Sequence, residues 1–276
     1  MKYLKQTLRY LFIESKGKHF LILLFISLIP AAAIAVCMPA ERFIANVVDA
    51  PAYKNWAEAF CAYFRGDIIS GVCIPLGIIL SIVTTSVIIS IIIGNFRIGT
   101  FSLPSVLRAT NDNFFPSVLF IGSTVLNWTV FFILYTLLSF MWYYIAIRVV
   151  FIVFSAITMA ILVLIMLYIE SSFTLWLPIM AIKGLRGKSA FTTAVYQSRG
   201  KQKYFLPGHL FSCLITVVTV ILAYFLAKVW YVSFVISALG YAFSSLFGIV
   251  FSIIAYFGEN YLPREDLNRS PYKRRF

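Results

Sequence analysis

Long apolar stretches constrain this chain more than any other feature of its sequence. A helix crosses a membrane with about 20 mainly apolar residues, and six stretches of that length follow one another along the chain. Hydrophobic residues make up 61% of the composition and charged residues only 12%, which is too few to cover a water-soluble surface. These features exclude most soluble enzymes and predict an all-α polytopic membrane protein. The expected spans are about 19–38, 68–94, 117–140, 149–170 with an extension to 182, 205–227 and 231–257.

The positions of the basic residues predict how these spans are oriented. Of the 23 Lys and Arg residues, 18 fall in the N-terminal segment, in the connectors after the second and fourth spans, or in the C-terminal tail. Positive residues accumulate on the cytoplasmic side of membrane proteins, so both termini are expected in the cytoplasm, beneath the cell membrane. The net charge of +13 therefore needs no nucleic-acid partner. The chain divides into a cytoplasmic amphipathic helix (1–18), a transmembrane domain (19–258) and a basic cytoplasmic tail (259–276).

Two segments outside the spans have the pattern of helices that lie on a membrane. Residues 2–16 place leucines on one face and basic residues on another, which is typical of an interfacial helix that contacts anionic lipid headgroups. An anchor that fixes the orientation is the simpler role, and partner binding is the alternative. In the outer connector, residues 39–67, aromatic residues recur at helical spacing and predict interfacial anchoring. A lid over an external cavity is the alternative there.

Two connectors on the basic side resemble each other and predict an internal repeat. An offset of 88 residues aligns Gly99–Thr110 with Gly187–Ser198, and Pro116 and Pro207 then lie near the start of the next span. Each connector is expected to form a short amphipathic helix. Both are entered from a span that runs in the same direction, so the repeat would be parallel, with its axis along the membrane normal. Chance similarity between two amphipathic loops is the alternative.

The repeated features also carry a resemblance to a group of membrane proteins. They are best represented by Trp176-Leu177-Pro178, Gly187, Ala194, Ser198 and Phe205. Over about residues 68–257 the chain resembles poorly characterised six-helix bacterial inner-membrane proteins related to the membrane domain of glycerophosphodiester phosphodiesterases. The resemblance implies an all-helical six-span fold. It implies no catalytic residue, because the phosphodiesterase chemistry of that group lies in a separate soluble domain.

The sequence contains no recognisable catalytic or metal-binding motif. Its two histidines, His19 and His209, lie near the ends of spans without another His or a carboxylate at ligand spacing, and each is expected to stay solvated. No metal, cofactor or enzymatic activity is therefore expected. Glu170 is the single acid between Asp112 and Glu259. An ionisable residue within a span indicates a functional site, and a carboxylate paired with Lys or Arg at the cytoplasmic rim is the simpler alternative.

Several polar, small or helix-breaking residues within the spans are expected to shape the packing. Asn127 should form a hydrogen bond between helices. Pro178 should kink the fourth span and redirect its extension, because proline cannot support a helical hydrogen bond. In the last span Gly240, Ser244 and Gly248 recur every four residues, a spacing that lets helix backbones approach closely. Packing inside the bundle is the simpler reading of this stripe, and a homodimer face is the alternative.

The second basic connector is expected to rest on another surface. Residues 183–203 hold six basic and no acidic residues, beside a short helix whose apolar face is formed by Phe191, Ala194 and Val195. Basic residues attract an anionic leaflet and the apolar face favours a helix that lies down. We expect this connector to contact the inner leaflet or a partner, with Phe191 buried.

The four cysteines show no CxxC spacing. Cys37, Cys61 and Cys73 fall near the predicted outer side of the membrane. Free thiols are expected, and a disulfide among these three is the alternative, because spacing alone cannot assign one.

The sequence favours a non-catalytic integral membrane protein, either a transport-associated or an envelope lipid-handling module, which contacts membrane lipids and a cytoplasmic or membrane partner subunit. The alternative is the permease subunit of an ABC exporter. Residues 102–110 and 189–198 would then be its coupling helices, and the ATPase would be a separate chain. Ion-coupled transport is disfavoured, because the middle of the predicted spans is almost purely apolar.

Overall fold

The protein is a multi-pass membrane protein, and the part of the chain that the structure describes contains helices and no strands. This computed structural model describes residues 1–14, 18–48, 55–64, 68–99, 103–145, 148–185 and 187–264. Six helices are long and apolar enough to cross a membrane, which confirms the predicted fold class. The helices are α1 (Lys2–Arg9), α2 (Lys18–Cys37), α3 (Arg42–Val48), α4 (Trp56–Cys61), α5 (Ile68–Ile98), α6 (Leu103–Ile145), α7 (Arg148–Phe173), α8 (Trp176–Lys183), α9 (Gly187–Ser198), α10 (Gln202–Phe225) and α11 (Trp230–Glu259).

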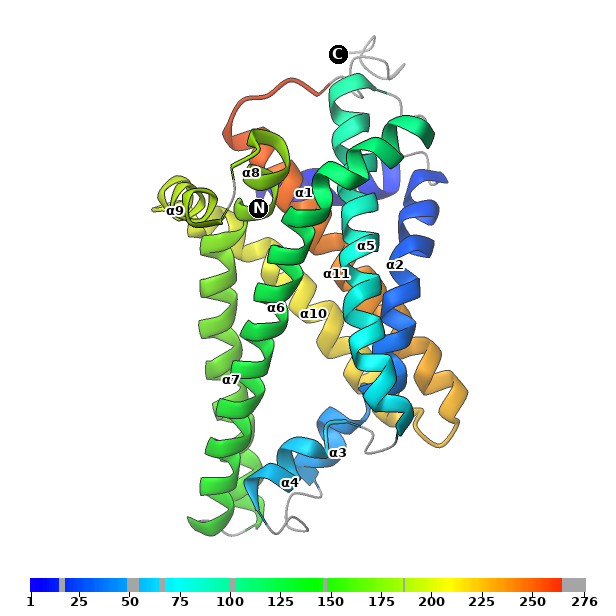
Figure 1. Ribbon diagram of the computed structural model, residues 1–276. Helices are drawn as coiled ribbons and strands as arrows, with labels where there is room; N and C mark the ends of the chain where they lie inside the picture. Colours follow the sequence, from blue (N-terminus) through cyan, green and yellow to red (C-terminus); the bar gives the residue numbers. More distant parts are fainter. Residues whose placement is uncertain are drawn as a thin grey trace.

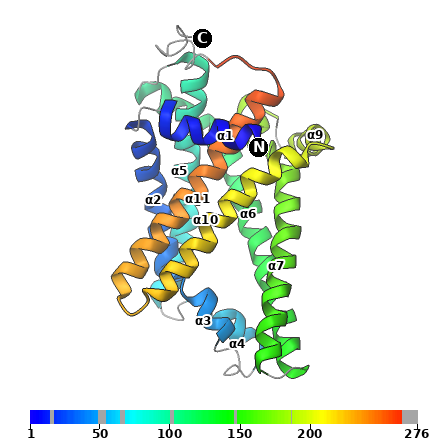
Figure 2. The same ribbon diagram turned by 180° about the vertical axis from the view of Figure 1, so that it is seen from behind.

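The long helices run between two ends of the molecule, and different short helices lie at each end. Figure 1 shows α1 and the C-terminal part of α11 at one end, the termini end, and α3 and α4 at the opposite end, the connector end. Seen from behind, α1 lies across the bundle while α2, α5, α6 and α7 run along it (Figure 2). An even number of spans requires the two termini to lie at the same end, and the structure meets that requirement.

The apolar core lies towards the termini end. Its members come mainly from Ile88–Phe96 of α5, Leu246–Phe257 of α11 and Leu175–Met180 around the start of α8. The outer surfaces of α6, α7 and α10 are mostly exposed and apolar. Lipid tails would cover such surfaces, so the large number of exposed apolar side chains is what a membrane-embedded bundle requires.

The N-terminal amphipathic helix packs on the bundle as well as facing outward. Helix α1 contacts α10 and α11, and a π-helical segment, Tyr10–Glu14, continues it. Tyr3, Thr7, Tyr10 and Leu11 are buried, and Leu4 and Leu8 are partly buried against the apolar core. The leucine face therefore packs on the bundle together with the rings of Tyr3 and Tyr10.

The two predicted connector helices differ in how they join the next span. The first runs on into α6 without a break, with Pro116 inside the helix. The second, α9, ends at a turn that contains Gly200 in a left-handed conformation with φ of 75°. Three residues inserted here, Arg199 to Lys201, separate α9 from α10. Gly99 and Gly187 both have positive φ, of 74° and 55°, but Gly99 directly follows α5 and donates its N–H to the carbonyl of Asn95, whereas Gly187 is the first residue of α9. The repeat itself stays a prediction.

The small-residue stripe of α11 packs closely at one position and not at another. A Cβ atom added to Gly240 would lie 2.0 Å from Oγ1 of Thr219 on α10, so only glycine fits there. Ser244 faces the same helix, with its Oγ 2.7 Å from Oγ of Ser212. At Gly248 an added Cβ would meet no atom within 4 Å. The expectation that Gly248 is a contact point is therefore wrong: the crossing of α10 and α11 is closest one and two turns earlier.

The outer connector folds back onto the bundle. Its Arg42 guanidinium donates to the carbonyl of Phe64, 2.5 Å away, and the ring of Phe43 lies 5.4 Å from that of Phe132 on α6. Ser233 at the start of α11 donates to Glu41, 2.6 Å away. The predicted aromatic anchor Trp56 is 45% exposed, as an interfacial side chain should be, and Tyr53 lies outside the described residues.

Candidate functional site

A small polar cluster lies where α7, α8 and α10 meet. Glu170 is in the last turn of α7, Thr174 lies in the break between α7 and α8, and His209 is in the second turn of α10. The break follows from Pro178, which has no N–H to donate to the carbonyl of Thr174 and whose ring would collide with that carbonyl in a continued helix. As the sequence predicts, the chain leaves the axis of α7 after its polar Glu170–Ser172 patch, and residues 176–183 form a separate helix.

The imidazole of His209 bridges the other two members of the cluster. Its Nε2 lies 2.7 Å from Oγ1 of Thr174, which is hydrogen-bonding distance. Its Nδ1 lies 3.5 Å from Oε2 of Glu170, which is an ion-pair distance. With the proton on Nδ1, the ring faces the carboxylate with a donor and accepts the threonine hydroxyl at Nε2. The three side chains therefore form one connected chain between two spanning helices.

Neighbouring groups hold this cluster in place. The Thr174 hydroxyl is also 3.1 Å from the carbonyl of Ser171, and the ring of Phe251 on α11 packs against the edge of His209 at a centroid distance of 5.7 Å. Gly208 makes room for that ring, because an added Cβ there would lie 2.3 Å from Phe251. The close approach of α10 to α11 thus fixes where His209 lies.

The exposure of the three side chains limits what the cluster can do. The order carboxylate, imidazole, hydroxyl is that of a nucleophilic triad. Thr174, however, is only 4% exposed, so a substrate carbonyl could not reach its Oγ1 in this conformation. The side chains of His209 and Glu170 are 16% and 27% exposed, so a hydrogen-bonding group can approach them. In this geometry Glu170 and His209 can hold a proton or contact a polar group, whereas Thr174 is not placed to attack a substrate.

This cluster corrects the expectations for both His209 and Glu170. His209 was expected to stay solvated without a carboxylate, and Glu170 to pair with Lys or Arg; instead the two pair with each other. Their separation of 39 residues hides the pairing from any spacing rule. The sequence contained a usable signal, because Glu170 lies near the end of one predicted span and His209 near the start of the next, which places both residues near the same end of the bundle.

The remaining predicted residues lie apart from this cluster. Asn127 is half-buried, and within the described part of the chain it does not form the expected hydrogen bond between helices. Phe191 is 38% exposed on the protein surface, with its ring 5.0 Å from that of Phe173 and 5.8 Å from that of Trp176, and its burial against lipid or a partner stays a prediction. Ser244 takes part in the contact between α10 and α11, which accounts for its spacing without a homodimer.

A second polar cluster ties the helix ends together at the termini end. Glu259, at the end of α11, forms an ion pair with Lys201 and accepts a hydrogen bond of 2.7 Å from the Tyr3 hydroxyl. Burial of the ring, together with this carboxylate, raises the pKa of Tyr3, so its hydroxyl stays a donor. Nearby, Arg264 pairs with Glu14 at 2.8 Å. Sequence reasoning missed these pairs, because they join residues up to 256 positions apart.

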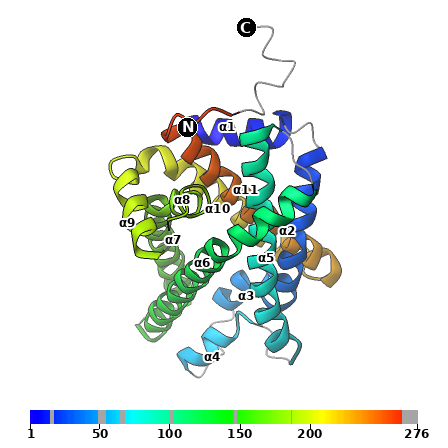
Figure 3. The ribbon, with the colours of Figure 1, turned by 45° about the horizontal axis from the view of Figure 1, so that its top comes forward.

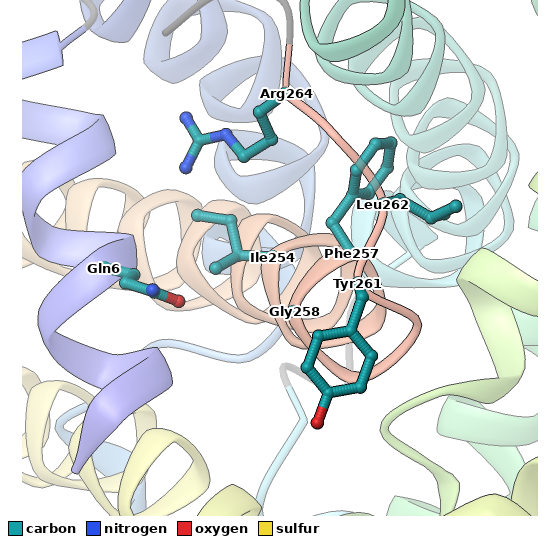
Figure 4. A pocket seen from close by; sticks show the side chains of 7 residues that line it. All are labelled: Gln6, Ile254, Phe257, Gly258, Tyr261, Leu262 and Arg264. Atoms are coloured by element: carbon teal, nitrogen blue, oxygen red, sulfur yellow. The ribbon is translucent and has the colours of Figure 1, made fainter. Parts of the chain in front are cut away.

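A pocket of about 290 Å³ opens beside these ion pairs. Gln6 of α1, Ile254 and Phe257 of α11, and Leu262 and Arg264 of the following segment line it (Figure 4). The Arg264 guanidinium lies 4.2 Å from the centroid of the Phe96 ring and pairs with Glu14, a carboxylate that also pairs with Arg9 at 3.0 Å. The pocket is therefore a recess with both apolar and polar walls beside a carboxylate that two guanidinium groups share.

The described residues contain neither a metal-binding cluster nor a disulfide. No group of three His, Cys, Asp or Glu side chains there is placed to hold a metal ion. Cys37, Cys61, Cys73 and Cys213 form no disulfide with one another, so the disulfide alternative is not realised in this structure.

Comparison of this chain with known proteins gives no match. No family model, no curated protein and no solved structure is significantly similar to it. The resemblance to six-helix bacterial inner-membrane proteins therefore stays a prediction from sequence motifs, and the site is interpreted from its own geometry.

Proposed function

We propose that the protein is a non-catalytic module of a bacterial cell membrane that handles lipids or assists transport, with both termini in the cytoplasm. Six spans, α1 across the bundle at the termini end and α9 at its edge support this proposal. The excess of Lys and Arg at that same end supports the orientation. Contacts with membrane lipids and with a partner subunit belong to the proposal.

The observation that carries the functional part is the Glu170–His209 pair. Among the ion pairs of the described residues, it is the one that joins two spanning helices, α7 and α10. Ionisable groups at membrane depth are expensive and usually mark a path for a substrate or a proton. The buried Thr174 hydroxyl argues against a nucleophile, so we infer a polar contact for a passing headgroup or a proton rather than a reaction.

The character of the spans narrows the substrate class. Along the six spanning helices the charged residues lie near helix ends, and the middle of each span carries no charged residue. A small hydrated ion would find no charged ligand there. An amphiphilic molecule with a polar headgroup and apolar tails fits better, since its tails could remain in the bilayer while its headgroup contacts Glu170 and His209.

Lipid exchange between leaflets tests this proposal directly. In proteoliposomes that contain a fluorescent phospholipid, dithionite should bleach label beyond the outer-leaflet fraction seen in protein-free vesicles. Glu170→Gln should slow that exchange roughly tenfold, the equivalent of about 1.4 kcal/mol in the barrier. Asn127→Ser is the matched control, because Asn127 is half-buried in a span but lies outside the cluster. Exchange no faster than in empty vesicles, or an unchanged Glu170→Gln rate, would contradict the proposal.

The orientation has its own test. In a background without the four native cysteines, Glu58→Cys at the connector end and Lys183→Cys at the termini end are both exposed positions. A membrane-impermeant maleimide should label Glu58→Cys in intact cells and Lys183→Cys only after the membrane is opened. The opposite labelling pattern would place the termini outside.

A permease subunit of an ABC exporter is the second candidate, and the exposed connector helices favour it. Leu103 and Leu107 at the start of α6 are 73% and 62% exposed, and Tyr196 on α9 is 80% exposed. Exposed apolar residues on short helices next to spans are what an ATPase subunit would contact in such a transporter. Co-purification of an ATP-hydrolysing subunit would favour this candidate over the first.

A further inference from the structure

Helix α9 has two faces of unusual composition. Its inner face consists of small residues, Ala190, Ala194 and Ser198, which are fully buried against α7 and α8. Small side chains at four-residue spacing let a helix lie close to its neighbours. The larger apolar residues are on the other side of the helix, which is the reverse of an amphipathic helix on a water-soluble protein.

The outward face of α9 combines an apolar centre with cationic ends. Phe191, Val195 and Tyr196 are 38%, 37% and 80% exposed, and Lys188 and Arg199 extend the same face by one turn on either side. The spacing of three and four residues keeps these five side chains on one side of the helix. The rings of neighbouring helices support Phe191 from behind, so this face is a firm surface.

Helix α9 lies at the perimeter of the bundle. Figure 1 shows α9 end-on above α7, at the outer edge of the bundle, and Figures 2 and 3 place it at the edge as well. A helix that lies across the end of a span, at the bundle perimeter, is at the depth of the lipid headgroups. At this depth, exposed side chains of α9 are within reach of lipid headgroups and of the upper part of the acyl chains.

The charge of this region selects the kind of lipid. From Lys183 to Lys203 the chain has six basic residues and no acidic one. Lys201 is paired with Glu259, whereas Lys188 and Arg199 are exposed. Exposed Lys203 lies over the ring of Tyr204, at 5.3 Å from its centroid, which extends the basic and aromatic surface to the start of α10.

We propose that the outward face of α9 binds anionic phospholipid, with headgroup phosphate at the cationic ends, Lys188 and Arg199, and the upper part of the acyl chains on Phe191, Val195 and Tyr196. Charge complementarity supports an anionic headgroup, and the apolar centre explains why a lipid fits better than a free phosphate. The proposal rests on the membrane placement in the proposed function, and not on lipid movement or on which side the termini face. A protein partner on this face is the competing occupant.

Lipid selectivity in nanodiscs provides the first measurement. The fraction of spin-labelled lipid that is motionally restricted should be higher for phosphatidylglycerol than for phosphatidylcholine. Lys188→Gln and Arg199→Gln should each lower that preference by up to about fivefold, and added salt should lower it too. Lys228→Gln, an exposed cation at the connector end, is the matched control and should leave it unchanged. Equal binding of both lipids, or the same loss in Lys228→Gln, would overturn the proposal.

The depth of α9 provides the second measurement. A nitroxide on Tyr196→Cys, in a background without native cysteines, should collide with oxygen more often than with a water-soluble nickel complex. A label that the nickel complex reaches more readily would place the face in water. A label shielded from both reagents would show that protein covers it. Either result overturns lipid binding on this face. Because both leaflets of the nanodisc have the same composition, the result does not depend on lipid movement between leaflets or on the orientation of the protein, so the leaflet-exchange and orientation tests are unaffected.

Discussion

Replacing Gly240 with leucine should abolish the close crossing of α10 and α11 and strongly destabilise the protein. An added Cβ would lie 2.0 Å from Oγ1 and 2.6 Å from Cβ of Thr219, and the second contact involves an atom that no rotation of the side chain can move away. Overpacking of a filled interface typically costs about 1–3 kcal/mol and sometimes more. Because the helices themselves must separate here, we expect about 3 kcal/mol, measured as a lower melting temperature of the purified protein in detergent.

The same substitution at Gly248 provides the control. Gly248 lies two turns further along α11, where an added Cβ meets no atom within 4 Å. Leucine has a higher helix propensity than glycine, so Gly248→Leu should be neutral or stabilising by up to about 1 kcal/mol. Equal melting temperatures for the two variants would show that the contact between α10 and α11 does not depend on Gly240.

Replacing Glu259 with alanine should release α1 from the end of the bundle. The carboxylate accepts the hydrogen bond of Tyr3 and pairs with Lys201, so its loss leaves both groups without this partner. A hydrogen bond to a charged group contributes about 1.5–3 kcal/mol, and we expect roughly 2 kcal/mol because Lys201 is 42% exposed. Hydrogen exchange should show faster exchange in residues 2–14, while the spans keep their protection.

Two further variants separate the hydrogen bond from the ion pair. Tyr3→Phe removes only the hydroxyl and should have a smaller effect than Glu259→Ala. Gly258→Ala leaves every polar group in place but would put a Cβ atom 2.5 Å from the Tyr3 ring, so it should also displace α1. If the backbone amides of residues 2–14 exchange hydrogen at the same rate in all three variants and in the unaltered protein, the attachment of α1 does not depend on this contact.

The spans and the helix break after α7 could be predicted from the sequence because both depend on local properties. The length of an apolar stretch decides whether a helix can cross a membrane, and Pro178 excludes a helical hydrogen bond wherever the chain goes. The left-handed glycines Gly99, directly after α5, and Gly187, the first residue of α9, adopt positive φ for the same local reason. Local rules failed for the first connector helix, which runs on into α6, because Pro116 bends a helix or ends it according to its surroundings.

The candidate site required information that no local rule supplies. The sequence singled out Glu170 by its isolation in an apolar stretch, but it assigned His209 to water. Their pairing depends on α7 and α10 being neighbours and on how each helix is rotated, and close packing at Gly208 and Gly240 restricts the rotation of α10 against α11. Packing of this kind couples residues far apart in the chain, so a periodic pattern shows which residues share a face but not what faces them.

By itself, therefore, the sequence determined the class of protein, the number of spans and the distribution of charge along the chain. These follow from the free energy of placing apolar and charged residues in lipid or water, which is nearly additive along the chain. Only the tertiary structure decided that Gly240 rather than Gly248 touches α10, that Tyr3 anchors α1 and that His209 meets Glu170. Inside a bilayer the apolar effect does not distinguish one helix face from another, so steric fit and a few polar contacts choose the arrangement.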